Sequence, residues 1–426
     1  MLDFFKSKKS KYINRLGPGI ITGASDDDPS GIATYSQAGS QFGFGFLWSA
    51  LFSFPLMVAV QEMCGRVGLV TGSGLAGVIK KYYSKTALYF CVFLLFFANS
   101  LNIGADLGAM ASSMQLLIPL PFTLLNVFFA LLIIYLEIKI PYSKYKSVLK
   151  YLTFSLFAYF LAFILIKHDA VTILKSTFVP NFSFTKEYFL VLVAILGTSI
   201  SPYLFFWQAG EEVEELVETG RIKKMGEKIT RVFKKDIVEL RLDTILGMFF
   251  SNIVMYFIIA TTASTLFTQG IHTVETATDA AIALKPLGGE LSYLLFVFGI
   301  LGTGFLSIPV LAGSVSYAIA ETLGIKEGLY NNFSKAKGFY ITIAFSTFLG
   351  LFVNLIGVPP FLLLFYSAVL NGVISPILLI FILLIANNKN IMRNYTNSLL
   401  SNIGGIVTIL VMSLSVAGLL YFTFVK

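Results

Sequence analysis

The run Gly23-Ala24-Ser25-Asp26-Asp27-Asp28-Pro29-Ser30-Gly31 interrupts the first long apolar segment of this chain. A carboxylate at membrane depth costs about 3 kcal/mol or more, so it is rarely kept there without a task. Proline removes a backbone donor, and glycine loosens the helix around it. The run therefore predicts a helix that breaks in mid-membrane, with free carbonyls and at least one carboxylate facing a cavity.

The composition places the chain in a membrane. Hydrophobic residues make up 56% of the sequence, charged residues only 13%, and the mean hydropathy is +0.80. A soluble domain has about 25% charged residues. The first residues are polar and basic and the first span carries carboxylates, so we expect no cleavable signal peptide. Cys64 and Cys91 offer neither a disulfide framework nor a metal-ligand spacing, and we expect both to be buried.

Apolar runs of about 20 residues, long enough to cross a bilayer, recur along the whole sequence. We predict an all-α, polytopic membrane protein with about eleven spans in a single transport domain. The expected spans are residues 16–38, 44–63, 86–116, 120–138, 147–167, 187–209, 243–268, 289–320, 338–356, 359–386 and 401–424.

The distribution of lysine and arginine predicts the orientation. If the N-terminus is cytoplasmic, the tail and every second loop hold 26 of the 31 basic residues. We therefore expect a multi-pass protein of the plasma membrane with its N-terminus inside. The net charge of +8 then reports membrane orientation, and a nucleic-acid partner is not implied.

The sixth expected span is interrupted as well, by Gly197-Thr198-Ser199-Ile200-Ser201-Pro202-Tyr203. Two interrupted helices at matching positions of two five-span halves indicate an inverted repeat with a binding site at mid-membrane. The halves are then residues 1–167 and 187–386, and the span at 401–424 lies outside the repeat. Broken helices in this arrangement bind ions and substrates in secondary transporters.

Several patches of sequence resemble the Nramp family of divalent-metal transporters. They are Gly17-Pro18-Gly19, the run from Asp28 to Thr34, Gln37-Ala38-Gly39, Gln61-Glu62 with Arg66 and Thr71-Gly72, and the run from Gly197 to Tyr203. The resemblance covers most of the chain, although only these patches are specific. It implies eleven or twelve spans and the inverted-repeat fold that is also seen in leucine-type transporters.

The resemblance also implies a ligand set. The family's first span carries Asp-Pro-Gly-Asn, whose aspartate and asparagine bind the metal; here the matching positions are Asp28 and Gly31. Its sixth span supplies a backbone carbonyl and then a methionine sulfur, matched here by Thr198 and Ser201. The expected metal-site residues are therefore Asp28, Gly31, Thr198 and Ser201, with the amide and the thioether of the family both replaced.

These replacements favour a hard cation. Thioether sulfur suits softer transition metals, whereas carboxylates, carbonyls, hydroxyls and water suit Mg²⁺, Ca²⁺ and Mn²⁺. Gly31 and Ser201 also widen the site, so a cation that dehydrates reluctantly can keep part of its water shell. The pattern is similar to that of Nramp-related magnesium transporters. We expect Mg²⁺ as the cargo, with Mn²⁺ also accepted and no bound cofactor.

Proton coupling is expected to be weak or absent. The third span keeps the family's aspartate as Asp106, but the glutamate three residues later is Ala109. The histidine that follows the span-six proline is replaced by Tyr203, and residues 338–356 contain no arginine. Asp106 and Tyr203 are kept as candidate proton or gating residues.

Simpler interpretations compete at each position. Asp28 can cap the second half of the broken helix, with or without binding metal. Asp26 and Asp27 are candidates for attracting or contacting a hydrated ion, and Asp106 can pair with an amide such as Asn102. The hydroxyls of Thr198 and Ser201 can bond the preceding helical turn and do nothing more.

Other polar residues have structural interpretations. Glu62 and Arg66, one helical turn apart, are expected to form an ion pair, and Asn354 and Asn371 to bond neighbouring helices. The polar stretch 211–242 is expected to be a solvated helix on the membrane surface, or alternatively a regulatory or cation-attracting segment.

Four other functions remain open. An amino-acid or other organic-solute carrier on this fold usually presents free amides to a substrate carboxylate, which the aspartates would repel. A proton-coupled importer of Mn²⁺ or Fe²⁺ is a second alternative, and a passive channel is a third. A membrane enzyme would need paired acid and base groups or a histidine-rich metal set, and the spans contain no histidine. The oligomeric state is not predicted, and a monomer is compatible with the sequence.

Overall fold

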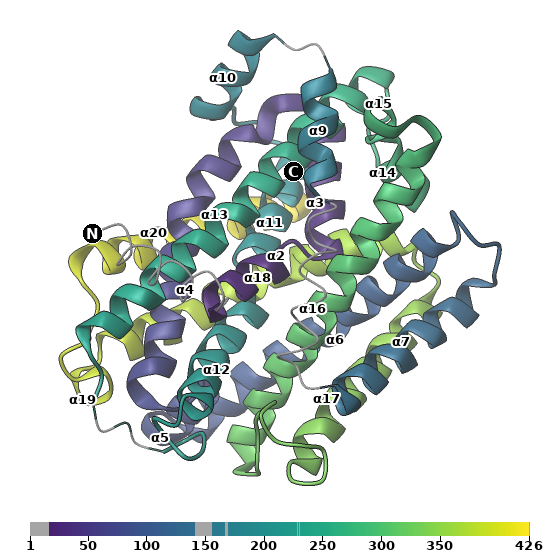
Figure 1. The fold of residues 1–426 in the computed structure, drawn as a ribbon. Coiled ribbons are helices and arrows are strands. Elements are labelled where there is room, and N and C mark those ends of the chain that lie inside the picture. Colours follow the sequence, from purple (N-terminus) through teal and green to yellow (C-terminus); the bar gives the residue numbers. More distant parts are fainter. Residues whose placement is uncertain (1–16, 141–155, 167–168, 228, 230, 426) are drawn as a thin grey trace, which may run out of the picture.

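The fold was analysed in a computed structural model, which describes residues 17–140, 156–166, 169–227, 229 and 231–425. All regular elements among these residues are helices (Figure 1). Eight of them are long and apolar enough to cross a membrane when each helix is followed through its bends, and α17 (Lys337–Val353) is a shorter apolar helix. This agrees with the expected all-α, polytopic class.

The first expected span consists of two helices, α2 (Pro18–Asp26) and α3 (Pro29–Phe42). The sixth is likewise divided into α11 (Lys186–Ser199) and α12 (Pro202–Glu218). Each second half begins with a proline at its first turn, where the missing N–H costs nothing and the fixed φ suits the helix. Both predicted breaks are therefore confirmed, and local chemistry explains where they fall.

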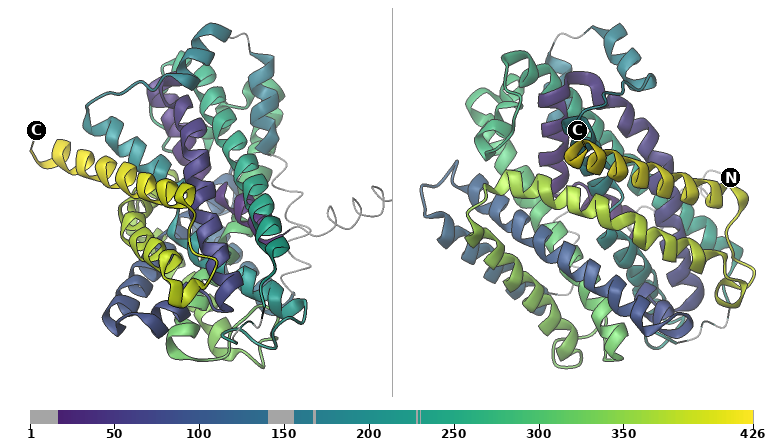
Figure 2. Two further views of the ribbon diagram at one scale, coloured as in Figure 1. Left: turned by 90° about the vertical axis from the view of Figure 1, so that its left-hand side faces the viewer. Right: turned by 180° about the vertical axis from the view of Figure 1, so that it is seen from behind.

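The remaining long helices surround these broken pairs. They are α4 (Leu47–Thr71), α6 (Lys85–Met114), α7 (Phe122–Lys139), α13 (Lys234–Thr265), α16 (Ser292–Leu323), α18 (Pro360–Asn387) and α20 (Leu399–Phe424). α2 and α3 pack on α13, α11 packs on α18, and α16 packs on α6. α20 lies on the outside of the bundle beside α18 (Figure 2).

Short helices mark the two ends of the bundle. α10 (Ala170–Phe178), α14 (Ala277–Ile282) and α15 (Lys285–Gly288) lie at one end, beyond α9 (Phe157–Leu165). α5 (Leu75–Tyr82) and α19 (Lys389–Met392) lie at the opposite end (Figure 1). The fifth expected span, 147–167, falls partly outside the described residues. The repeat boundaries 1–167 and 187–386 stay a prediction.

The expected surface helix at 211–242 is wrong. α12 continues through this stretch to Glu218, and Glu211, Glu212 and Glu214 are buried. The helix ends there, and α13 begins only at Lys234. Glu214 is covered by α16 and the segment after it, because it accepts hydrogen bonds from the Tyr317 hydroxyl at 2.6 Å and from the Tyr330 amide at 3.1 Å. Glu212 accepts a hydrogen bond from the Gln208 side-chain amide at 3.0 Å.

Two smaller expectations are confirmed. Cys64 and Cys91 are free and buried. Glu62 and Arg66 form a buried ion pair at 3.0 Å, and Arg241 on α13 reaches the same carboxylate at 2.9 Å.

Candidate metal-ion site

Asp28 lies at the junction of the broken first span and is the N-cap of α3. One carboxylate oxygen accepts hydrogen bonds from the Gly31 amide at 2.7 Å and the Ser30 hydroxyl at 2.6 Å. The other accepts from the Asn102 side-chain amide at 2.9 Å. Asp28 is 1% exposed, and no lysine or arginine among the described residues forms an ion pair with it. The Asp28 carboxylate is thus buried, it caps the N-terminus of α3, and no basic side chain among the described residues neutralises its charge.

The two helix breaks meet beside this carboxylate. The Ser30 hydroxyl lies 3.3 Å from the Thr198 hydroxyl at the end of α11. A Cβ placed on Gly31 would lie 3.5 Å from the same Thr198 oxygen and 3.3 Å from the Asp26 carbonyl oxygen. The fold therefore brings together Asp28, Gly31 and Thr198, although Asp28 and Thr198 are 170 positions apart in the sequence.

Ser201 is held differently. Its hydroxyl bonds the carbonyls of Gly197 at 2.5 Å and Thr198 at 2.7 Å, so its proton is committed to its own helix break. These bonds agree with the simpler interpretation of a hydroxyl that bonds the preceding turn, and they leave the lone pairs of the hydroxyl oxygen available to a metal, so the role of Ser201 at the metal site stays a prediction. The Thr198 carbonyl that was expected to face the metal is the oxygen that Ser201 occupies here.

Asp26 and Asp27 face another helix than Asp28 does. Both carboxylates contact the Ser251 hydroxyl on α13, which donates to Asp26 and lies 3.4 Å from Asp27. The second oxygen of Asp26 is buried without a hydrogen-bond partner. These two acids therefore line the α13 side of the break, while Asp28 lies toward α6.

The candidate gating residues also have partners. Asp106 accepts a hydrogen bond from Ser307 on α16 at 2.8 Å, so the expected pairing with Asn102 is not the one observed. The Tyr203 hydroxyl donates to the Ser25 carbonyl at 2.9 Å, which ties the start of α12 to the end of α2. Tyr203 thus links the two broken helices directly.

Asn102 is the residue that the sequence interpretation undervalued. Its amide nitrogen donates to Asp28, and its amide oxygen accepts from the Ser367 hydroxyl of α18 at 2.7 Å. Asn102 thereby connects the first span with α18 through α6. The one sign of this role in the sequence was the position of Asn102, an amide one helical turn before Asp106 in an otherwise apolar span.

The two asparagines expected to bond neighbouring helices differ. Asn354 donates to the Gly104 carbonyl at 2.8 Å, as expected. For Asn371 the expectation is wrong, because neither polar atom of its buried amide has a hydrogen-bond partner. Asn371 lies one turn after Ser367 on α18, the helix that packs against α11, and it is an uncommitted polar group of the kind that ligands satisfy.

Within the described part of the chain, no three histidine, cysteine, aspartate or glutamate side chains converge to hold a metal ion. A dication at Asp28 would therefore complete its coordination with hydroxyls, backbone carbonyls, amides or water. Such a donor set suits hard cations such as Mg²⁺, Ca²⁺ and Mn²⁺.

The sequence matches the family described as natural resistance-associated macrophage protein-like (Nramp) over residues 19–422. The chain belongs to the Nramp family. This confirms the resemblance seen in the broken spans. It also excludes the membrane-enzyme alternative, because the family consists of metal transporters.

Individual relatives agree with this assignment. A divalent metal cation transporter, MntH, of Chromohalobacter salexigens is 25% identical over 423 residues, covering 96% of this chain and 92% of the relative. MntH of Bacillus subtilis is 26% identical over 314 residues, covering 70% of this chain and 69% of its own. The crystal structure of the Eremococcus coleocola manganese transporter, in complex with an aromatic bis-isothiourea compound, superposes with a TM-score of 0.76 at 16% identity, over 98% of this chain and 87% of that one. The expected inverted-repeat transporter fold is thereby confirmed.

Proposed function

We propose that this Nramp protein moves divalent metal cations across the membrane by alternating access, with partly hydrated Mg²⁺ as the main cargo and Mn²⁺ also accepted. One observation carries the proposal: Asp28 is a buried carboxylate without a basic partner, at the point where both broken helices meet. A buried charge of this kind is costly unless a counter-ion or proton compensates it. A dication resting beside Asp28 would supply that compensation.

The neighbouring atoms support a hard cargo. Ser30, Thr198 and the Asp26 carbonyl contribute oxygens around Gly31, and the Tyr35 ring lies 3.2 Å from where a Cβ on Gly31 would be, so it takes up part of the space beside them. The Met255 sulfur lies 3.8 Å from the Ser199 hydroxyl, which is also hydrogen-bonded to Tyr35. That thioether therefore contacts Ser199, and the contacts of Asp28 are all to nitrogen or hydroxyl donors.

Weak or absent proton coupling forms part of the proposal. Ala109 cannot carry a proton, and the hydroxyl of Tyr203 is engaged with a backbone carbonyl. Metal flow would then follow the metal gradient and the membrane potential. A pH-sensitive dye inside vesicles tests this, and acidification that tracks metal influx would contradict it.

The orientation is proposed from charge. The end of the bundle that carries α5 and α19 also carries Lys80, Lys81 and Lys389. Basic residues accumulate on the cytoplasmic side of membrane proteins. We therefore assign this end of the bundle, and the N-terminus, to the cytoplasmic side. We assign the protein to the plasma membrane. Cysteine labelling from either side of intact cells would check the assignment.

The central experiment is uptake into proteoliposomes, comparing Mg²⁺, Mn²⁺, Ca²⁺ and Cd²⁺. Asp28→Asn removes the charge but keeps a good N-cap residue, so it separates metal binding from helix capping. Its control is Asp169→Asn, which changes the exposed N-cap of α10 in the same way. We expect Asp28→Asn to abolish saturable uptake while Asp169→Asn keeps it. Wild-type preference for Cd²⁺ over Mg²⁺ would refute the selectivity argument and favour a transition-metal importer.

A further inference from the structure

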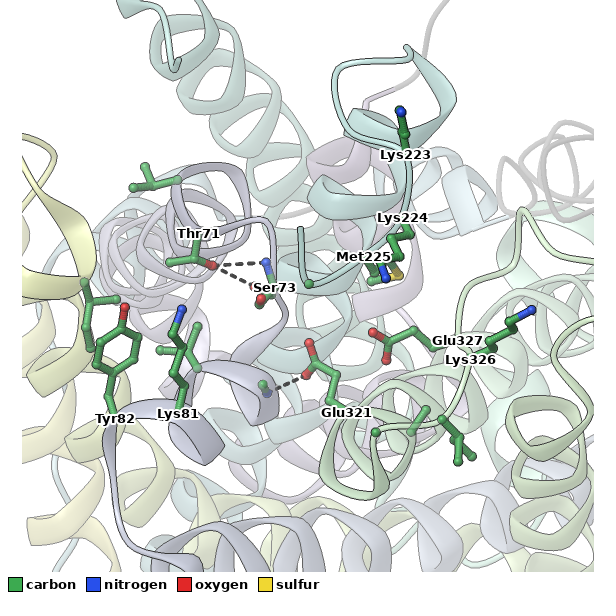
Figure 3. Close-up of a pocket in the computed structure, with 18 of the residues that line it drawn as sticks. Thr71, Ser73, Lys81, Tyr82, Lys223, Lys224, Met225, Glu321, Lys326 and Glu327 are labelled. Atoms are coloured by element: carbon green, nitrogen blue, oxygen red, sulfur yellow. Dashed lines mark hydrogen bonds between the residues drawn. The ribbon is translucent and has the colours of Figure 1, made fainter. Parts of the chain in front are cut away.

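A cavity of about 690 Å³ opens at the α5 and α19 end of the bundle (Figure 3). Its walls come from the ends of α4 and α16, from α5 and α19, and from the segments around residues 223–226 and 324–331. None of the residues proposed to hold the transported ion lines it. Its volume falls within the roughly 300–1,000 Å³ that is usual for small-molecule sites.

The walls of this cavity are rich in positive charge. Five basic side chains line it against two acidic ones, and the basic residues are Lys81, Lys223, Lys224, Lys326 and Arg393. Figure 3 shows Lys224 extending toward Glu327 and Lys81 on the opposite side of the cavity, whereas Lys223 and Lys326 extend away from the two glutamates. In the described part of the chain, none of these five side chains forms an ion pair with a carboxylate. None of these five charges is therefore neutralised by a direct ion pair among the described residues.

The two acidic residues that line the cavity, Glu321 and Glu327, neutralise little of its positive charge. Glu321 accepts hydrogen bonds from the backbone amides of Gly74 at 2.5 Å and Gly77 at 2.8 Å, so its charge is committed to the start of α5. Burial, with the charges of Glu321 and Glu214, raises the pKa of the Glu327 carboxyl to about 9. The raised pKa favours the protonated form of Glu327, which reduces the negative charge that this side chain brings to the cavity.

We infer that this cavity binds a phosphate-bearing anion. Lysine ammonium groups and an arginine guanidinium are the side chains that recognise phosphate, the first as point charges and the second as a planar fork. Arg393 is held at φ 51°, the one positive φ of a non-glycine residue in the described chain. This costly backbone conformation occurs at the edge of the cavity, and such conformations concentrate at ligand clamps.

Two sources carry this chemistry. Basic pockets at the cytoplasmic ends of membrane helices bind anionic lipid headgroups. A soluble phosphate compound would reach the same side chains from the aqueous side. Both sources need the cluster of Lys81, Lys224 and their neighbours, and the experiment below distinguishes them.

The bound anion would also slow transport, a consequence that rests on the proposed function. The walls come from both halves of the chain, which already touch at this face: the Gly226 amide donates to the Gly72 carbonyl at 2.7 Å, and the Gly77 amide donates to the Glu321 carboxylate at 2.8 Å. Opening this face for ion release requires such contacts to separate. An anion held between Lys81 and Lys224 adds another bridge across the same opening.

Binding is tested on the full-length protein in phosphatidylcholine nanodiscs. Sodium pyrophosphate is titrated calorimetrically at constant ionic strength into wild type, the pocket variant Lys81→Ala/Lys224→Ala, and the control Lys335→Ala/Lys337→Ala. The control removes two exposed lysines that do not line the cavity, Lys335 in the neighbouring loop and Lys337 at the start of α17. In parallel, the thermal midpoint of each protein is compared with and without phosphatidylglycerol in the disc.

We expect the pocket variant to weaken pyrophosphate binding at least tenfold, or to lose the midpoint rise caused by phosphatidylglycerol, while the control keeps both. The first result identifies a soluble ligand and the second a lipid headgroup. Lys81→Arg/Lys224→Arg should restore binding, which separates lost charge from misfolding. The inference is overturned if wild type binds no pyrophosphate and phosphatidylglycerol stabilises the pocket and control variants equally. Pyrophosphate enclosed with the cytoplasmic face should slow uptake by the wild type relative to the pocket variant, a comparison in which chelation of the metal by pyrophosphate is common to both; binding without this difference would refute only the effect on transport.

Discussion

Replacing Gly23 with alanine should force α2 away from α13. The two helices meet glycine to glycine: a Cβ on Gly23 would lie 2.7 Å from the Gly247 Cα, and closer still to the Gly247 carbonyl group. Carbon atoms in ordinary contact are about 3.5–4.0 Å apart, so the helices must separate by about 1 Å. Both sides of the contact are backbone, and no side chain can rotate to relieve it.

Overpacking of this kind costs about 1–3 kcal/mol. The separation would also displace the end of α2, which carries Asp26 and leads into Asp28. We therefore expect Gly23→Ala to lower the thermal midpoint of the purified protein by several degrees and to reduce the maximal rate of Mg²⁺ uptake.

Gly45→Ala is the matched control, because a Cβ there would meet only the Phe42 Cβ, at an ordinary 3.6 Å. Both variants add one methyl group to a glycine close to the first span. If Gly23→Ala were as stable and as active as Gly45→Ala, the close approach of α2 and α13 would not be a requirement of this fold, and the reasoning would fail.

Three further predictions concern single groups. Asn102→Leu removes a charge-assisted hydrogen bond to Asp28, worth about 1.5–3 kcal/mol, and should change the Kd for Mn²⁺ by tenfold or more in equilibrium dialysis; an unchanged Kd would show that this amide does not act on the site. Gly31→Asn should raise Mn²⁺ uptake relative to Mg²⁺, because the added amide narrows the space for a hydrated ion, and an unchanged ratio would count against the width argument. The pKa of Glu327 is raised from 4.5 to about 9 by burial, so between these pH values the folded chain keeps a proton that the unfolded chain releases. Stability should therefore fall as pH rises through this window, and Glu327→Gln, compared by thermal melts with exposed Glu275→Gln, should remove that part of the slope.

Local sequence predicted the elements of the site well. The breaks at Pro29 and Pro202 were placed correctly because proline acts on its own turn, without regard to distant residues. The capping role of Asp28 follows the same logic, since an N-cap contacts the amide three residues ahead. The apolar spans followed from the thickness of a bilayer.

Hydrogen-bond partners that are distant in the sequence could not be predicted as well. The bond between Asn102 and Asp28 joins positions 74 residues apart, and it depends on how α6 packs against the break. The burial of Glu214 was mispredicted because charge at helical spacing normally indicates a solvated face, whereas here Tyr317 and the Tyr330 amide accommodate the carboxylate. Asn371 is the opposite case, an amide expected to be bonded and found without a partner.

The sequence by itself determined that this chain crosses a membrane through helices broken beside Asp28 and Pro202, because hydropathy and proline chemistry act locally. Only the tertiary structure decided that Asp28 accepts a hydrogen bond from Asn102, whereas Asp26 and Asp27 contact the Ser251 hydroxyl on another helix. The physical reason is that three adjacent carboxylates are equivalent in sequence. The irregular backbone at the break turns Asp28 toward one helix and Asp26 and Asp27 toward another, and packing determines which side chains lie there.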